Sequence, residues 1–504
     1  MQITEQRFFH IIGLSLVVKL VFAWWIPITG DEAYFITWGN NLDYGYYDHT
    51  PMVGWWLAAL LQVSDSLLWL RLPNVLISTF IGWSIYRLTC SHSQPAAALA
   101  GSVFLLAPVN LFPVLITTDV PLILFSFLSA WAFYRAQQAD QFSWYIASGV
   151  LLGLAFFSKF FAGLLGVAYF IYLVLFVRRG WRPYAGLLLI IAGTLPFIAL
   201  NLLWNYYHCW DNYLFNLYNR TSGSSFSLLT LGKYLLVLVY LLTPPVFYYL
   251  LRDFSEIKRA VKDADKRIYV LLFLIPIGLF FLLSFWKVIG LHWLLSFYPF
   301  LFIGMAYVFS QQQLRRTFYF MIVFSVIHLV FFASVLGFSP GLIKSNEKLL
   351  QSYVFSAYSE EIVEKLKNIA PGYQLATSSY GDSSVLSYTA KEHVILLGEG
   401  SYHARQEDML TDFRNLDGKN IVILNYKNKA KHFRAFFDEI ETGSIDVAGA
   451  RYFYTKGKGF HYPAYREQVL ERVMQSYYKI PDFLPVGSCY MFEKYGEPGK
   501  VQQE

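Results

Sequence analysis

Long apolar segments, separated by short polar ones, fill the first two thirds of the chain. Crossing the roughly 30 Å hydrocarbon layer of a membrane takes about 20 apolar residues in a helix. Segments close to this length lie at 8–27, 70–90, 95–113, 120–136, 142–158, 160–178, 184–203, 231–251, 268–286, 291–310 and 317–338. The pattern predicts a polytopic α-helical membrane domain over residues 1–338 with about eleven transmembrane helices.

A shorter apolar run follows the first long segment. Residues 53–62 contain the neighbouring Trp55 and Trp56, and tryptophan is enriched where a membrane meets water. This run is therefore predicted to be a helix lying in the membrane interface. The first long segment lacks a basic leader and a small-residue cleavage site, so we expect it to be a retained anchor.

Composition agrees with an integral membrane protein. Of the 504 residues 56% are hydrophobic and 15% are charged, whereas soluble domains are about 25% charged. The mean hydropathy is +0.40 and the formal net charge is +6. The three cysteines, Cys90, Cys209 and Cys489, match no metal-ligand spacing, and we expect no disulfide framework among them.

The basic residues predict the orientation, because cytoplasmic loops carry an excess of Lys and Arg. With the N-terminus inside, fourteen basic residues fall in cytoplasmic loops and five near the outer face. The outer five are Arg71, Lys159, Arg220, Lys233 and Lys287. The first outer loop, residues 28–63, and everything after residue 338 are therefore predicted to lie outside the cytosol.

The composition changes at residues 339–341, and residues 339–504 are polar with short alternating elements. Helices are predicted at 360–368, 406–416 and 431–439, and strands at 374–377, 394–397 and 421–424. Helices alternating with strands favour a C-terminal α/β domain with a partly parallel sheet. No catalytic motif is found in it, so we expect an accessory role.

The first outer loop carries the strongest sign of chemistry. Residues 29–51 include four carboxylates, Asp31, Glu32, Asp43 and Asp48, and no Lys or Arg. Acids this dense beside a membrane helix are costly to hold near hydrocarbon and indicate a functional site. The simpler alternatives are a helix cap for Asp31 and Glu32 and a turn before proline for Asp48.

Other charged groups lie at the same predicted face. Asp119 begins a segment, Lys159 separates two segments, and Lys287 and His292 flank a third junction, while Arg220 lies in a long outer loop. A helix cap for Asp119 and a topology-setting role for Lys159 are the alternatives. Carboxylates that accept a proton and cations that stabilise a departing phosphate are what glycosyl transfer from a lipid phosphate needs.

The order of these motifs resembles one family. The motifs are residues 30–34, 47–56, 118–122 and 153–159, and Lys287 followed by His292 and Trp293. They are similar to membrane glycosyltransferases of the GT-C class, in the branch of the protein O-mannosyltransferases and the lipid A aminoarabinose transferase. The resemblance covers roughly residues 8–310.

The resemblance implies inverting transfer of a sugar from a polyprenyl-phosphate-linked donor. The acceptor would be lipid A or lipopolysaccharide, another glycan, or a protein, at the periplasmic face of a bacterial inner membrane. No nucleic acid is expected as a partner. Asp31 would activate the acceptor. The candidate catalytic residues are Asp31, Asp48, Glu32 and Asp119, and the candidates for the donor phosphate are Lys159, Lys287, Arg220 and His292.

A divalent metal is the one cofactor that the resemblance suggests. In the aminoarabinose branch the loop acids can hold such an ion, and Asp31, Asp48 and His49 would be its ligands here. A structural role is the alternative for His49. The chain departs from that branch at Tyr34, where the branch has arginine, and at residues 48–51 and 292–295. The departures leave the sugar open, as a hexose or a pentose.

A membrane transporter or flippase for a lipid-linked or sugar substrate is the alternative function. Its expected signs are helices broken near the membrane midplane and two matching halves. The charges here gather at one predicted surface, and no internal repeat is found. The sequence therefore favours a polyprenyl-phosphate-sugar-dependent glycosyltransferase.

Overall fold

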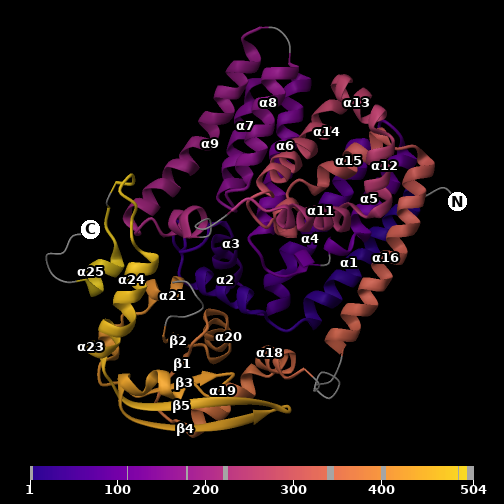
Figure 1. Ribbon diagram of the computed structural model, residues 1–504. Helices are drawn as coiled ribbons and strands as arrows, with labels where there is room; N and C mark the ends of the chain where they lie inside the picture. Colours follow the sequence, from indigo (N-terminus) through magenta and orange to yellow (C-terminus); the bar gives the residue numbers. More distant parts are fainter. Residues whose placement is uncertain are drawn as a thin grey trace. The chain divides into compact units, whose positions relative to one another are not determined.

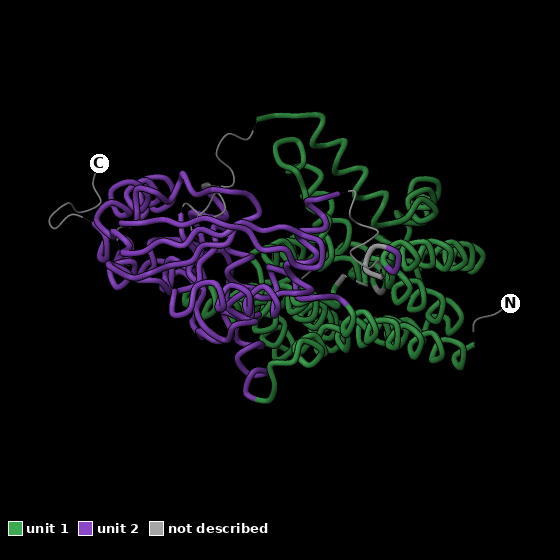
Figure 2. The backbone as a smooth tube through the Cα atoms, turned by 90° about the horizontal axis from the view of Figure 1, so that it is seen from below, with its two compact units in different colours: residues 1–25, 63–200, 223–332 green, residues 26–62, 201–222, 333–504 purple. Residues whose placement is uncertain are grey.

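The computed structural model describes residues 4–110, 112–177, 180–219, 225–337, 346–398, 405–485 and 487–496. The chain forms two compact units (Figure 2). Unit 1 consists of residues 1–25, 63–200 and 223–332, and unit 2 of residues 26–62, 201–222 and 333–504. No single cut of the chain separates the units, because residues 26–62 and 201–222 belong to unit 2 and interrupt unit 1.

Unit 1 is helical (Figure 1). Its helices are α1 (Glu5–Trp25), α4 (Leu67–Thr89), α5 (Gln94–Leu106), α6 (Asp119–Ala139), α7 (Phe142–Phe156), α8 (Ala162–Phe176), α9 (Arg182–Tyr207), α11 (Leu228–Leu242), α12 (Pro244–Arg252), α13 (Phe254–Lys262), α14 (Ala264–Leu283), α15 (Tyr298–Val308) and α16 (Gln311–Gly337). The last residues of α9 and α16 belong to unit 2. Helix α1 packs against α4 and α5, α6 against α7, and α14 against α8 and α15.

All eleven predicted apolar segments contain helix, but they differ in length. Among the described residues five helices are long and apolar enough to cross a membrane: α1, α4, α9, α14 and α16. Helices α11 and α12 make a sixth span if the pair, bent by 102° at its break, is counted as one. Helices α5, α7, α8 and α15 have 13, 15, 15 and 11 residues. Eleven spans therefore stay a prediction.

Small and polar side chains join the helices of unit 1. Ser129 of α6, Ser148 of α7 and Tyr169 of α8 are buried and share one hydrogen-bond network, with 2.9 Å between Ser129 Oγ and Tyr169 Oη. In α5 the run Ala96–Ala100 is buried. Small residues let helix backbones approach, and polar pairs hold them where lipid gives no hydrophobic driving force.

Unit 2 contains a five-stranded sheet in the order β2-β1-β3-β5-β4. The strands are β1 (Gln374–Thr377), β2 (Ile395–Leu396), β3 (Ile421–Asn425), β4 (Phe437–Val447) and β5 (Ala450–Phe460). Strand β1 is parallel to β2 and β3, whereas β5 is antiparallel to β3 and β4. The predicted strands and the partly parallel sheet are confirmed. The β4–β5 turn has positive φ at Ala448 and Gly449, as two-residue hairpin turns require.

The helices of this part are predicted less well. The predicted helix at 360–368 is confirmed as α19 (Ser359–Ile369), and the one at 406–416 is broken into α21 (Gln406–Leu410) and a 3-10 turn. The predicted helix at 431–439 is wrong: α22 (Ala430–Phe433) and a 3-10 turn lead into β4 at Phe437. Pairing of β4 with β5 decides this segment, because sheet contacts override local preference. Helices α18 (Glu347–Ala357) and α20 (Tyr380–Ala390) were not predicted.

The expectation about the cysteines is also wrong. Cys209 and Cys489 form a disulfide within unit 2, and Cys90 of unit 1 is free. The bonded cysteines are 280 residues apart, so their spacing gives no sign of the pairing. The bond ties the segment 201–222 to the C-terminal part of the chain.

Removing this disulfide should destabilise unit 2. We expect Cys209→Ser to lower the free energy of unfolding by about 2–5 kcal/mol, because the cross-link restricts the unfolded chain. Thermal unfolding in detergent would measure the loss. The control Cys90→Ser, which removes a free thiol, should leave the transition unchanged, and equal transitions for both variants would contradict the assignment.

Candidate functional site

The acidic loop of unit 2 folds around helix α2 (Gly30–Asn40). Thr29 is the N-cap, and its hydroxyl oxygen accepts a hydrogen bond from the Glu32 backbone N–H. The Glu32 carboxylate in turn accepts hydrogen bonds from the Thr29 backbone N–H at 3.1 Å and from the Thr29 hydroxyl at 3.2 Å. This reciprocal capping box fixes the start of the helix. Glu32 is fully buried in this capping box, whereas Asp31 lies exposed in the first turn.

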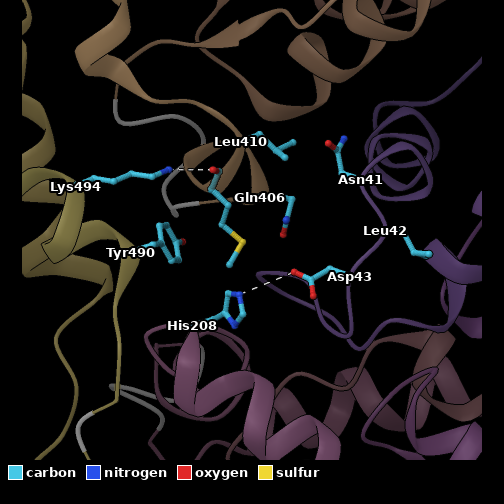
Figure 3. Close-up of a pocket in the computed structure, with 9 residues that line it drawn as sticks. Asn41, Leu42, Asp43, His208, Gln406, Leu410, Tyr490 and Lys494 are labelled. Carbon is cyan, nitrogen blue, oxygen red and sulfur yellow. Dashed lines mark hydrogen bonds and ion pairs between the residues drawn. The ribbon is translucent and has the colours of Figure 1, made fainter.

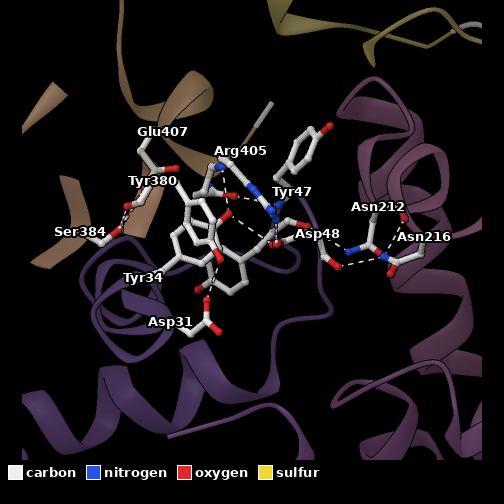
Figure 4. A network of polar contacts seen from close by, with 12 residues as sticks. Asp31, Tyr34, Tyr47, Asp48, Asn212, Asn216, Tyr380, Ser384, Arg405 and Glu407 are labelled. Atoms are coloured by element: carbon white, nitrogen blue, oxygen red, sulfur yellow. Dashed lines mark hydrogen bonds and ion pairs between the residues drawn. The ribbon is translucent and has the colours of Figure 1, made fainter. Parts of the chain in front are cut away.

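Asp31 accepts a hydrogen bond from a residue 349 positions later in the chain. Tyr380, the first residue of α20, donates from its Oη to Asp31 Oδ1 at 2.7 Å (Figure 4). Helices α2 and α20 meet closely at two glycines: a Cβ on Gly30 would lie 3.0 Å from the Gly381 Cα. The glycines therefore allow the approach that brings Tyr380 to Asp31. No protein partner of Asp31 Oδ2 lies among the described residues.

Asp48 has a different environment, because it is buried and paired. Arg405 donates from Nη1 to Asp48 Oδ2 at 2.6 Å, and Tyr34 donates from its Oη to Asp48 Oδ1 at 3.3 Å (Figure 4). Asp48 is 4% exposed. The Arg405 guanidinium also lies over the rings of Tyr380, at 4.3 Å, and Phe215, at 5.1 Å. Packing on both sides and a charged partner fix Arg405 in place.

The segment 201–222 supports the same loop from another direction. Asn212 donates to the backbone carbonyl of Tyr46 at 3.0 Å, and Asn216 donates to that of Asp48 at 2.9 Å. Tyr47 donates from its backbone N–H to Gln406 Oε1 at 2.8 Å. Residues 46–48 are thus held by side chains from two distant segments, which fixes the position of Asp48.

These contacts give the two predicted acids different chemistry. Asp31 is exposed and keeps a carboxylate oxygen for a further proton or hydrogen bond. Asp48 has its charge balanced by Arg405 and both oxygens occupied. A free carboxylate suits a general base, whereas a paired one suits electrostatic support.

The predicted metal site does not fit these residues. Arg405 and Tyr34 occupy both oxygens of Asp48, and the His49 ring packs against Phe35 and Trp38 with centroids 6.4 and 6.0 Å away. Over the described ranges no three His, Cys, Asp or Glu side chains gather as ligands would. We therefore derive no step through a metal.

In unit 1 the structure brings Asp119 and Lys159 together. Asp119 begins α6, and Lys159 lies in the break between α7 and α8. Lys159 Nζ donates to Asp119 Oδ1 at 2.8 Å, with both side chains about one-tenth exposed. Thr118, not Asp119, is the N-cap of α6. The pair is therefore an ion pair at a helix junction.

Two of the remaining predicted residues lie in one segment of unit 1. Lys287 is half-buried and His292 is exposed in the segment between α14 and α15, where residues 291–294 form a 3-10 turn. Arg220 lies outside the described residues. The order of residues along the chain gave no sign of Tyr380 or Arg405, which lie 349 and 357 residues from their carboxylate partners.

Glu407 lies buried near Asp48, and the adjacent Asp408 is half-buried. Loss of hydration raises the pKa of Glu407 to about 8 and that of Asp408 to about 6. Ser384 donates to Glu407, and Tyr478 donates to Asp408. At neutral pH Glu407 is thus mostly protonated, which avoids a second negative charge near Asp48.

These raised pKa values predict a pH-dependent stability. Both lie above the values of about 3.9–4.3 in an unfolded chain, so folding favours the protonated carboxyls. The stabilisation is complete below about pH 4 and is lost as pH rises through the folded pKa values. Thermal unfolding should therefore occur at lower temperature at about pH 8.5 than at about pH 5. Glu407→Gln should remove the upper part of this change, and an unaltered profile would contradict it.

Part of the chain matches a known protein family. The family described as dolichyl-phosphate-mannose-protein mannosyltransferase matches residues 48–204. The lipid A galacturonosyltransferase RgtD of Rhizobium johnstonii is 29% identical over 193 residues, which cover 35% of this chain and 38% of RgtD. The similarity therefore spans well under half of that relative.

Solved structures extend the likeness to nearly the whole fold. ArnT from Cupriavidus metallidurans, bound to undecaprenyl phosphate, is similar with a TM-score of 0.61 and 13% identity, covering 89% of this chain and 97% of ArnT. The chain has the fold of the GT-C membrane glycosyltransferases. ArnT in the apo state gives a TM-score of 0.59 at 14% identity over the same shares. The resemblance predicted from the sequence motifs is confirmed, and the GT-C fold with its apolar helices makes this an integral membrane protein.

Proposed function

We propose that this chain transfers a sugar from a polyprenyl-phosphate-linked donor to an acceptor hydroxyl outside the cytosol. The acceptor oxygen forms a bond to the anomeric carbon, the bond from that carbon to the phosphate oxygen breaks, and polyprenyl phosphate leaves. Attack opposite the leaving group inverts the anomeric centre. The acceptor proton passes to the Asp31 carboxylate.

The observation that carries this proposal is the unequal pair of loop acids. Asp31 is exposed with an oxygen to spare, and Tyr380 orients it. Asp48 is neutralised by Arg405 and keeps the loop in shape without competing for the proton. General-base help of this kind contributes about 10²–10⁴-fold to a rate.

The names of similar proteins support the kind of donor and acceptor. The matched family uses dolichyl-phosphate-mannose, ArnT is seen with undecaprenyl phosphate, and RgtD acts on lipid A. We propose lipid A, another glycan or a protein as the acceptor and leave the sugar as a hexose or a pentose. The Cys209–Cys489 disulfide supports placing unit 2 in an oxidising compartment, the periplasm of a bacterial inner membrane.

Lys159 is proposed to bind the donor phosphate together with Lys287 and His292. We expect Lys159→Ala to raise the KM for donor by about tenfold or more and to leave the KM for acceptor unchanged, because a lost cation weakens phosphate binding. Initial rates at varied donor concentration measure this. Lys233→Ala, at an exposed lysine of α11, is the control.

Lys159→Ala also leaves Asp119 without its ion-pair partner. The double variant Asp119→Asn/Lys159→Ala should therefore restore folding but not donor use. An unchanged donor KM would contradict the role.

Mass spectrometry of whole cells tests the proposed function. Lipid A, polysaccharides and envelope proteins would be compared between cells carrying the natural chain and cells carrying Asp31→Asn. We expect one class of molecule to lose the mass of one sugar in the variant. Identical spectra in all three classes would reject transfer to any of the proposed acceptors.

A further inference from the structure

A pocket of about 390 Å³ opens in unit 2 beside the acidic loop (Figure 3). Four segments line it: residues 41–43 after α2, His208, α21 and α25 (Tyr490–Tyr495). Its volume falls within the roughly 300–1,000 Å³ of small-molecule sites. None of the residues assigned to the transfer step lines it.

One wall of the pocket is a carboxylate facing an imidazole. Asp43 Oδ2 lies 4.0 Å from His208 Nε2, and both side chains are about one-third exposed. The other ring nitrogen, Nδ1, lies 2.8 Å from the Trp204 carbonyl oxygen, and the ring stacks on Trp204 with centroids 4.3 Å apart. These contacts fix the ring, so Nε2 and the Asp43 carboxylate are presented to the pocket together.

The opposite wall combines a polar amide with aromatic and aliphatic surface. Gln406 points toward the space between Asn41 and Asp43 (Figure 3), and Tyr490, Met409 and Leu410 supply apolar contact. Lys494 borders the pocket, where its Nζ donates to the Met409 carbonyl at 3.1 Å. The pocket thus offers hydrogen-bond donors and acceptors next to an aromatic ring and aliphatic side chains. This lining matches a saccharide, in which hydroxyl groups alternate with C–H faces. A lipid chain would need a mainly apolar lining.

Gln406 connects this pocket to the acids. Its side chain lines the pocket and accepts from the Tyr47 N–H, and its backbone N–H donates to Tyr34 Oη at 3.1 Å. Tyr34 in turn donates to Asp48. The residue before it is Arg405, the ion-pair partner of Asp48. Gln406 therefore links the pocket directly to Tyr47 and, through Tyr34, to Asp48.

We propose that this pocket binds a saccharide unit of the acceptor, adjoining the unit whose hydroxyl reacts. The inference rests on the proposed transfer reaction and identifies the acceptor as a glycan or glycolipid, since the pocket contacts a sugar ring. A protein acceptor without sugar would not use it.

The test is a variant that fills the pocket and leaves Asp31 and Asp48 unchanged. Leu42 is 64% exposed and lines the pocket, so Leu42→Trp should block it while leaving the buried residues in place. Leu349→Trp changes an exposed leucine of α18 in the same way and is the matched control. Binding of N,N′-diacetylchitobiose to the full protein in detergent is measured by saturation-transfer NMR, and transfer by initial rates with a glycolipid acceptor.

We expect the disaccharide signal in the natural chain and in Leu349→Trp, and its loss in Leu42→Trp. The acceptor KM should rise about tenfold in Leu42→Trp, the effect of losing one or two hydrogen bonds, with the donor KM unchanged. No signal from the natural chain, or an equal signal from Leu42→Trp, would overturn the pocket assignment even if transfer proceeds. Disaccharide binding without any transfer would uphold the pocket and reject the transfer reaction.

Discussion

Replacing Asp31 by asparagine is expected to lower sugar transfer by about 10²–10⁴-fold, the contribution of a positioned general base. Asparagine keeps the size of the side chain and can still accept the hydrogen bond from Tyr380, so the fold should be unchanged. The carboxylate that takes the acceptor proton is lost. Turnover of the purified variant at saturating donor and acceptor measures the effect.

The control for this variant is Asp446→Asn, which removes an exposed carboxylate of β4 that pairs with Arg451. It should transfer sugar at the natural rate. Donor binding to Asp31→Asn should also stay unchanged, because Asp31 acts on the acceptor. If Asp31→Asn turned over as fast as the wild-type protein, the role of Asp31 as the general base would be refuted.

Arg405→Gln should have the largest effect on stability. It leaves Asp48 buried without its cation, and breaking a buried ion pair in this way costs about 3–5 kcal/mol. Transfer should fall as well, because Arg405 also packs on Tyr380, which orients Asp31. Denaturant unfolding and transfer rates of the same preparation measure the two effects.

A double variant separates charge from packing. Arg405→Gln with Asp48→Asn removes both charges, so we expect it to recover most of the lost stability. Arg451→Gln breaks an exposed ion pair between β5 and β4 and should cost less than about 1 kcal/mol. If Arg405→Gln were as stable as Arg451→Gln, the buried pair would not hold the loop.

Local patterns predicted much of this molecule. The apolar runs indicate the helices of unit 1, because a helix that crosses a membrane needs a continuous run of apolar residues. Strand β3 is read from a short run of branched aliphatic residues that becomes fully buried. The acidic loop stands out because its carboxylates follow a long apolar segment without any basic residue between them. The structure gathers Asp31 and Asp48 near α2 with their partners.

Contacts between distant parts of the chain could not be predicted from these patterns. Tyr380 and Arg405 look like ordinary polar residues of a C-terminal segment that was expected to be accessory, yet they hold the two acids. The Cys209–Cys489 bond and the β4–β5 hairpin depend on tertiary pairing in the same way. The local sequence indicates only the secondary-structure preference of a segment. These features depend on which other parts of the chain pack against that segment.

The most direct test of the account is a transfer assay with the purified chain in lipid vesicles. The donor is a polyprenyl phosphate carrying a radiolabelled sugar, and a glycolipid acceptor is present on the same side. We predict labelled acceptor together with one free polyprenyl phosphate for each sugar transferred, and neither product with Asp31→Asn. Movement of intact labelled donor across the vesicle membrane, with no bond broken, would contradict the account and favour a transporter.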